Sequence, residues 1–278
     1  MKLYNINVNG EVHLAVEGVK GLVDATAAGF AADMDEVIKS GELSALEAIA
    51  ADESLPLVEK PEYANIVNKV GKLVCVGLNY ADHASGISMK LPEYPILFSK
   101  FADSLVPCGA KVDLPTWEMS YDYEAELVVV IGKECWGVNE EEAKAAIFGY
   151  SCGNDLSCRD AQMRSGQWLI GKALPGFGPC GPCITTADSL DPDKGVSVKT
   201  YVNGELRQDG VTTDMIFNCA RIVSYASKYI KLMPGDLIYT GTPSGVAMED
   251  KESKSWLEPG DTVEVVIEGI GSLVNEMI

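Results

Sequence analysis

Two kinds of hydrophobic spacing divide the chain. Apolar and polar positions nearly alternate over residues 2–8 and 12–16, on either side of Asn9 and Gly10, which is a strong β-hairpin signal. Residues 33–50 carry apolar side chains at helical spacing, interrupted at Gly41. The candidate buried positions of that helix are Met34, Val37, Ile38, Leu43 and Leu46. We therefore predict that residues 1–68 form a small N-terminal α+β domain.

From residue 72 onward, short strand-like runs alternate with glycine and proline turns. The clearest predicted strands are residues 72–76, 96–99, 123–131, 197–202, 237–240 and 262–267. Two segments have helical patterns, residues 140–146 and 215–229. This pattern predicts an α+β fold whose second domain, residues 69–278, is dominated by strands.

A pair of glutamates in the predicted strand 123–131 is the strongest chemical signal. Glu124 and Glu126 point to the same side of a strand, with Cα atoms roughly 6–7 Å apart. A solvated strand face is the commoner setting for such a pair, but the apolar run that follows is typical of a buried core strand. Two buried carboxylates need a compensating cation, and Asp155 supplies a third oxygen ligand. We predict a site for Mg²⁺, with Mn²⁺ or Ca²⁺ as alternatives.

Further motifs follow one another in a fixed order along the chain. They are GLNYADHA at 77–84, PILFSK at 95–100, DYEAEL at 122–127, NDLSCRDAQ at 154–162, GK at 171–172 and TGTPSGV at 240–246. Together they resemble the fumarylacetoacetate hydrolase family over about residues 72–278. Each motif alone is a weak signal, whereas the ordered set is specific.

The resemblance implies a fold and a set of site residues. The implied fold is the mixed β-roll of this family, preceded by a small cap, and the implied assembly is a homodimer formed through the C-terminal domain. The implied roles are metal ligands at Glu124, Glu126 and Asp155, a catalytic lysine at Lys172, and substrate contacts at Arg159, Gln162, Gly241 and Thr242.

Two reactions remain open from the sequence. A 2-oxo acid that chelates a divalent cation places developing enolate charge beside that cation. Carbon–carbon hydrolysis of an acylpyruvate or a related 2,4-dioxo acid uses this effect, and we rank it first by a narrow margin. The alternative is decarboxylation or tautomerisation of an oxaloacetate-like or unsaturated 2-oxo diacid, which needs no hydrolytic water.

His83 is the candidate general base, because an imidazole exchanges protons near neutral pH. In hydrolytic members of the family, a glutamate three positions later usually works with this histidine. Gly86 occupies that position here. Its presence puts water activation in question and favours the second reaction, while a purely structural histidine is a further alternative.

Composition narrows the choice of partners and compartment. The formal net charge is −19, which argues against nucleic acid as a partner, because no basic patch is visible. A small anionic 2-oxo acid must therefore be captured locally by the metal and a few basic side chains. No run of residues has the length of a membrane span or the character of a secretory signal. We expect a cytoplasmic protein with reduced cysteines.

One cysteine motif suggests a different chemistry. Cys180 and Cys183 have the C-G-P-C spacing of a thioredoxin-type pair. Such a pair needs its first thiol at a helix N-terminus, where the thiolate is stabilised. Strand-like residues follow the motif, so we assign it little weight as a redox or zinc site.

Overall fold

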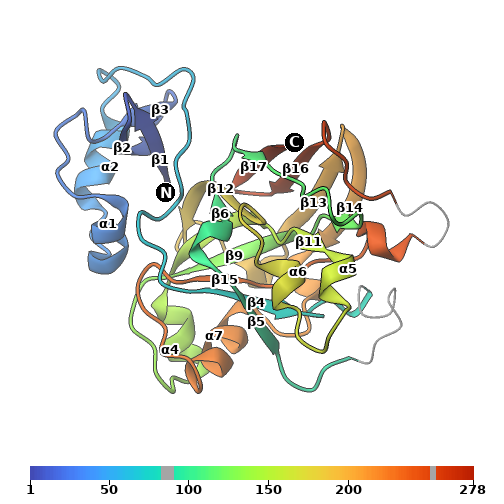
Figure 1. Ribbon diagram of the computed structural model, residues 1–278. Coiled ribbons are helices and arrows are strands. Elements are labelled where there is room, and N and C mark those ends of the chain that lie inside the picture. The colour runs from blue at the N-terminus through green and yellow to red at the C-terminus, as the bar shows by residue number, and fades with distance from the viewer. Residues whose placement is uncertain (83–90, 251–254) are drawn as a thin grey trace.

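A ten-stranded mixed sheet runs through the whole molecule (Figure 1). The computed structural model describes residues 1–82, 91–250 and 255–278. The main sheet has the order β3-β2-β1-β12-β10-β9-β15-β4-β5, with β6 paired to β12. Its strands are β1 (Lys2–Val8), β2 (Glu11–Glu17), β3 (Leu22–Asp24), β4 (Leu73–Gly77), β5 (Ile96–Lys100), β6 (Leu105–Val106), β9 (Ala125–Ile131), β10 (Ile147–Asn154), β12 (Gly178–Thr186) and β15 (Leu237–Tyr239).

A second sheet packs against the first. It has five strands in the order β14-β13-β16-β17-β7, and a separate two-stranded ladder joins β8 to β11. The bounds are β7 (Lys111–Val112), β8 (Tyr121–Asp122), β11 (Ser157–Cys158), β13 (Ser197–Val202), β14 (Glu205–Val211), β16 (Thr262–Ile267) and β17 (Gly271–Met277). Side chains of both sheets, including Val129, Val198 and Val265, share one buried hydrophobic cluster. This cluster forms the core behind the strand that carries the two glutamates.

Over residues 1–82, 91–250 and 255–278, the helices are few and short. They are α1 (Met34–Ser40), α2 (Ser44–Ala51), α4 (Glu140–Ala146), α5 (Arg159–Gln162), α6 (Leu169–Lys172) and α7 (Cys219–Ser227), with 3-10 turns at Ala102–Ser104, Pro192–Lys194, Thr212–Asp214 and Ala247–Glu249. Helices α5 and α6 lie side by side next to the ladder of β8 and β11 (Figure 1). Mixed sheets with few helices confirm the predicted α+β class.

The N-terminal hairpin has the predicted turn, and its strands belong to the main sheet. β1 pairs with β2 around Asn9 and Gly10, and both turn residues have positive φ. β1 also pairs antiparallel with β12, where Lys2 lies opposite Thr185. The first strands therefore belong to the same sheet as the strands between residues 73 and 239. The proposed boundary at residue 68 stays a prediction.

The helix predicted over residues 33–50 is two helices. Asp33 and Glu36 form a capping box at the start of α1, and Gly41 ends it with φ of 69°. That left-handed conformation favours glycine, so the interruption predicted at Gly41 is a complete break. The helix predicted from residue 215 begins only at Cys219, because the Asn218 side chain caps it by accepting a hydrogen bond from Arg221 N.

The strand predicted over residues 123–131 begins at Ala125, two residues later than expected, and a break separates it from β8. Tyr121 and Asp122 form β8, and the long strand β9 starts at Ala125. At the break, Glu124 N donates to Asn154 Oδ1 and Ala125 N donates to Gln208 Oε1. Side-chain acceptors thus replace the ladder partners over these residues. This detail depends on residues distant in sequence.

Several strands lacked a clear sequence signal. The strands that were not predicted are β3, β6, β7, β8, β10, β11, β14 and β17, and only the last residues of β12, from Ile184, had a strand-like pattern. β12 includes the whole C-G-P-C motif and is buried along its length, although its glycines and prolines are typical of a turn. Within the described residues, no helix has both the length and the apolar character needed to cross a bilayer.

Gly153 is packed so closely that adding a single methyl group there should destabilise the protein. A Cβ added to Gly153 would lie 2.4 Å from a Val128 methyl carbon and 2.7 Å from the Tyr239 ring. We expect Gly153→Ala to lower the free energy of unfolding by about 1–3 kcal/mol, as overpacking does, measured by urea denaturation. Gly166→Ala is the matched control, because no heavy atom lies within 4 Å of its added Cβ. Equal stabilities of the two variants would contradict this account.

Candidate active site

Three buried carboxylates meet where β9 begins and β10 ends. Glu124 immediately precedes β9, Glu126 is its second residue, and Asp155 directly follows β10. One oxygen from each side chain can be chosen so that all three lie within 4.8 Å of one another. The antiparallel pairing of β9 and β10 brings Asp155 to this point, since Asn154 lies opposite Ala125. The structure therefore brings together the three residues that the sequence predicted as metal ligands.

This cluster has an electrostatic cost. Burial raises the pKa of Glu126 well above its ordinary value, and repulsion from Asp155 and Glu124 raises it further. The backbone N–H of Gly241 donates to Glu126 Oε2 at 2.7 Å, which partly offsets the cost. A cation between the three carboxylates would remove the repulsion.

Two basic side chains from α5 and α6 face the same carboxylates. Lys172 Nζ lies 2.6 Å from Glu124 Oε2 and 2.9 Å from Asp155 Oδ2. Arg159 Nη2 lies 2.7 Å from Glu124 Oε1 and 2.8 Å from Asp122 Oδ2. Burial alone would lower the pKa of both cations, but the facing carboxylates raise it above the ordinary value. Both side chains are therefore held charged in the protein interior.

Sequence reasoning missed two charged residues of this network. Lys100 has a fully buried side chain, and its Nζ lies 2.6 Å from Asp155 Oδ1. Asp122 is also fully buried and accepts hydrogen bonds from Arg159 Nε and from the backbone N–H groups of Ala247 and Met248. Both lie inside motifs that carried the family resemblance. Their apolar surroundings were an available signal of burial, but their partners were not predictable from spacing.

The donor set fits a divalent cation. Four carboxylates (Asp122, Glu124, Glu126 and Asp155) face three cationic side chains (Lys100, Arg159 and Lys172). Although Asp155 Oδ1 is ion-paired with Lys100, it accepts no hydrogen bond from the described residues. An oxygen-rich group with surplus negative charge is what hard cations bind. With all four carboxylates ionised, these side chains have a net charge of one negative unit. A bound divalent ion would change that net charge to one positive unit.

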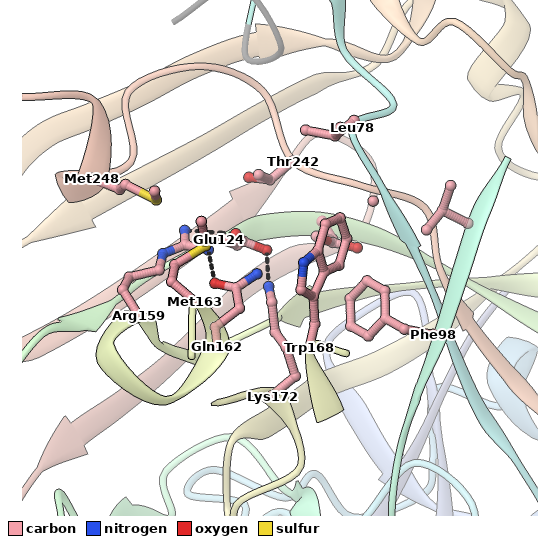
Figure 2. A pocket seen from close by; sticks show the side chains of 13 residues that line it. Leu78, Phe98, Glu124, Arg159, Gln162, Met163, Trp168, Lys172, Thr242 and Met248 are labelled. Carbon is pink, nitrogen blue, oxygen red and sulfur yellow. Dashed lines mark hydrogen bonds and ion pairs between the residues drawn. The ribbon is translucent and has the colours of Figure 1, made fainter. Parts of the chain in front are cut away.

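A cavity opens above the carboxylates and has an apolar wall (Figure 2). Glu124, Glu126 and Lys172 line its charged end, and Gln162 and Thr242 also contribute to its lining. The remaining wall consists of Val76, Gly77, Leu78, Phe98, Met163, Trp168 and Met248, with Arg159 at the charged side. The charged end of the cavity directly adjoins its apolar wall, with Lys172 Nζ 5.3 Å from the centroid of the Phe98 ring.

Gly241 and Thr242, two of the predicted substrate contacts, lie in the loop after β15. Gly241 has φ of 95°, and a Cβ there would lie 2.7 Å from Asn79 Cβ, so glycine is required for the close approach. The next residue, Thr242, lines the cavity. Gln162 also lines it, and its Oε1 accepts a hydrogen bond from Arg159 Nη1, which leaves its NH₂ as the group it can offer a ligand. Gly241 reaches the site through its backbone N–H.

Arg159 lies at the cavity but has several protein partners. Its Nε, Nη1 and Nη2 all donate to side chains of the network, to Asp122, Gln162 and Glu124. This geometry makes Arg159 a fixed positive charge at the cavity wall. Its predicted direct contact with substrate stays a prediction.

Two other predictions concern His83 and the two cysteines of the C-G-P-C motif. His83 and Gly86 lie outside the described residues, so the general base stays a prediction. Cys180 and Cys183 are free, buried thiols within β12, and burial raises the pKa of Cys180 to about 12 and that of Cys183 to about 11. Redox chemistry requires an accessible thiolate, and this environment opposes one.

The fold and site together define an α+β enzyme with a carboxylate cluster at the bottom of a partly apolar cavity. Residues 72–278 match the family model described as fumarylacetoacetate (FAA) hydrolase C-terminal. The chain belongs to the fumarylacetoacetate hydrolase family, as its motifs predicted. This family contains hydrolases, isomerases and tautomerases.

Curated relatives have different activities. The chain is 40% identical over 256 residues to the 2,4-didehydro-3-deoxy-L-rhamnonate hydrolase of Sphingomonas sp., a match that covers 91% of this chain and 89% of the relative. It is 36% identical over 251 residues to the mitochondrial oxaloacetate tautomerase Fahd2a of Rattus norvegicus, covering 88% and 79%. Similarity alone therefore leaves the reaction open.

Solved structures support the fold, and one of them contains a metal. A fumarylacetoacetate hydrolase from Exiguobacterium antarcticum superposes with a TM-score of 0.88 at 34% identity, covering 100% of this chain and 99% of that one. A fumarylpyruvate hydrolase from Pseudomonas aeruginosa, in complex with Mn²⁺ and pyruvate, has a TM-score of 0.69 at 33% identity, covering 80% and 92%. The predicted family fold is confirmed.

The raised pKa of Glu126 predicts a pH effect in chelator-treated protein. Above the ordinary carboxyl pKa, the unfolded state holds Glu126 ionised at little cost, whereas the native state favours its protonated form. The native state then binds more protons, so this contribution to stability rises as pH falls. We expect Glu126→Gln to raise the melting temperature more at pH 8 than at pH 5.

The control for this measurement is Glu258→Gln, a change at an exposed residue. Its melting temperature should follow that of the unmodified protein at both pH values. A Glu126→Gln protein less stable than the unmodified protein at pH 8 would show that the ionised carboxylate stabilises the metal-free fold.

Proposed function

We propose that this chain is a divalent-metal-dependent hydrolase that cleaves a carbon–carbon bond in an acylpyruvate or a related 2,4-dioxo acid. The observation that carries the proposal is the convergence of three buried carboxylates at the charged end of a cavity. Glu124, Glu126 and Asp155 would hold the ion, with Mg²⁺ proposed as the natural metal and Mn²⁺ or Ca²⁺ as alternatives. A bound ion would supply positive charge next to the enolate oxygen of a chelating 2-oxo acid.

Residues around the carboxylates would stabilise charge, orient the substrate and activate water. Lys172 would keep an ammonium beside the developing negative charge, and its ion pairs with Glu124 and Asp155 hold that ammonium in place. Thr242 and the NH₂ of Gln162 would orient the substrate carboxylate. His83 would accept the proton of the attacking water, a role that rests on the sequence alone. Hydrolysis then adds water across the bond and releases a free acid and a 2-oxo acid.

The apolar wall supports a substrate with an uncharged acyl group. Phe98 and Trp168 meet edge to face with ring centroids 5.5 Å apart. Trp168 can occupy this place because position 77 is glycine, and a Cβ there would lie 2.3 Å from the indole ring. Among the described lining residues, the cations Arg159 and Lys172 lie at the charged end. A second carboxylate on the substrate, placed against Phe98 and Trp168, would lose its hydration to apolar side chains.

A tautomerase or decarboxylase acting on oxaloacetate or a related diacid is the second candidate. Gly86 favours it, because the glutamate that usually assists the histidine in hydrolytic members is missing. The similarity to an oxaloacetate tautomerase also supports it.

We further propose that the protein is a cytoplasmic homodimer, as the family resemblance implies. Light scattering of the purified protein tests its oligomeric state.

The central experiment compares Mn²⁺-loaded and chelated protein on acetylpyruvate and oxaloacetate. We expect metal-dependent loss of the acetylpyruvate enol absorbance with acetate and pyruvate as products. Asp155→Asn should lower kcat/KM by at least about a hundredfold, because removing one charged ligand weakens both metal binding and charge stabilisation, whereas Glu258→Gln should leave kcat/KM unchanged. Enol–keto exchange or CO₂ release from oxaloacetate, without acetylpyruvate cleavage, would establish the second candidate.

The apolar wall leads to a separate prediction about substrate choice. Trp168→Ala should raise KM for an acylpyruvate with a longer apolar acyl chain by about tenfold, since the contact with an aromatic side chain is worth roughly 1.5 kcal/mol. KM for acetylpyruvate should change much less. Trp136→Ala is the control, because that tryptophan is exposed and does not line the cavity. A uniform change for all substrates would mean that Trp168 has no role in selectivity.

A further inference from the structure

Gln208 connects the carboxylate strand with the substrate loop. It lies in β14 and is 1% exposed. Its Oε1 accepts hydrogen bonds from Ala125 N at 2.9 Å and from Thr200 Oγ1 at 2.7 Å, and its Nε2 donates to Pro243 O and Thr242 Oγ1, both at 2.8 Å. Ala125 separates the two glutamates of the carboxylate cluster. The amide thus ties the start of β9 to the loop that follows β15.

The orientation of this amide is determined by its backbone partners. Ala125 N can only donate and Pro243 O can only accept, so Oε1 must face Ala125 and the NH₂ must face Pro243. Reversing the amide would place two donors together at one end and two acceptors at the other. Unlike many amide side chains, Gln208 has an assignment that follows from chemistry.

This orientation determines whether the Thr242 hydroxyl donates or accepts in its hydrogen bond with Gln208. One hydrogen of the Gln208 NH₂ goes to Pro243 O, and the other goes to Thr242 Oγ1. Thr242 must therefore act as the acceptor in that hydrogen bond. A threonine hydroxyl has one proton to donate, and in the part of the chain that the structure describes, Thr242 Oγ1 makes no other hydrogen bond. Because Thr242 lines the cavity (Figure 2), its proton is available to a ligand there.

We propose that Gln208 is a positioning residue that keeps the Thr242 hydroxyl as a hydrogen-bond donor toward the carboxylate of the substrate. The inference rests on the proposed function, which places a 2-oxo acid in this cavity. A carboxylate only accepts hydrogen bonds, so a hydroxyl with its proton turned toward the protein would meet it lone pair to lone pair. Gln208 removes that alternative, because it offers Thr242 only donors.

The complete hydrogen bonding of the Gln208 amide supports its proposed role. All four hydrogen-bonding positions of the Gln208 side chain are used, two as acceptor and two as donor. The amide has no spare capacity with which to accept the Thr242 proton. The same contacts limit movement of the loop relative to Glu124 and Glu126, so the donor is held at a constant place beside the carboxylate cluster.

The test is a double-mutant cycle on binding of oxalate, a planar dicarboxylate probe, to Mn²⁺-loaded protein by calorimetry. Thr242→Val should raise the oxalate Kd by about tenfold, as expected for one lost hydrogen bond to a charged group. Gln208→Met keeps the length of the side chain and removes its polarity, and it should raise Kd by nearly the same factor. The double variant should bind no more weakly than Thr242→Val alone, because both changes remove one interaction.

A matched control separates positioning from stability. Thr200→Val removes one hydrogen bond to Gln208 Oε1 but leaves the amide held by Ala125 and Pro243. It should lower the melting temperature without changing the oxalate Kd. Thr242→Ser, which keeps the hydroxyl, should bind oxalate within about twofold of the unmodified protein. If Gln208→Met does not fold, Gln208→Glu replaces it, since a carboxylate keeps the acceptors and removes both donors.

The outcomes distinguish this inference from the proposed function. Additive effects of Gln208→Met and Thr242→Val, or an unchanged Kd in Gln208→Met, would overturn the role of Gln208 while leaving the metal site intact. Mn²⁺ affinity, measured separately by electron paramagnetic resonance, should be the same in all these variants. Failure of the unmodified protein to bind Mn²⁺ would instead overturn the proposed function.

Discussion

Surplus negative charge held away from water is the constraint on which this site depends. Four buried carboxylates share three buried cations, and burial, together with repulsion from Asp155 and Glu124, raises the pKa of Glu126 well above its ordinary value. In a medium of low dielectric constant, such charges are tolerated only when partners are held closely in place. The strands and short helices that supply Lys100, Arg159 and Lys172 are therefore as much a part of the site as the carboxylates.

The same carboxylates also organise the loops above them. Glu126 accepts the backbone N–H of Gly241, and Asp122 accepts those of Ala247 and Met248. A hydrogen bond to an ionised carboxylate is stronger than one between neutral groups. The cavity wall and the charged end are thus parts of one network. The relatives similar to this chain have different activities.

The carboxylate cluster was predictable because period-two spacing in an apolar strand is a local property. Glu124 and Glu126 were paired from their spacing alone, and motif order added Asp155. The sequence did not reveal the strand break at Glu124, because Asn154 and Gln208 supply the acceptors that replace the ladder there. Lys100 was missed for the same reason. Its ion-pair partner lies more than fifty residues further along the chain.

By itself, the sequence determined the α+β class, the family, the hairpin at Asn9 and Gly10, and the identity of the three carboxylates, since these follow from local periodicity and motif order. Tertiary structure alone decided how charge is balanced and which way hydrogen bonds run. Asp122, Lys100 and Gln208 acquire their roles only when the fold brings them to Arg159, Asp155 and Ala125, respectively. Pairings of this kind depend on which strands meet, and periodicity within a single strand contains no information about its neighbours.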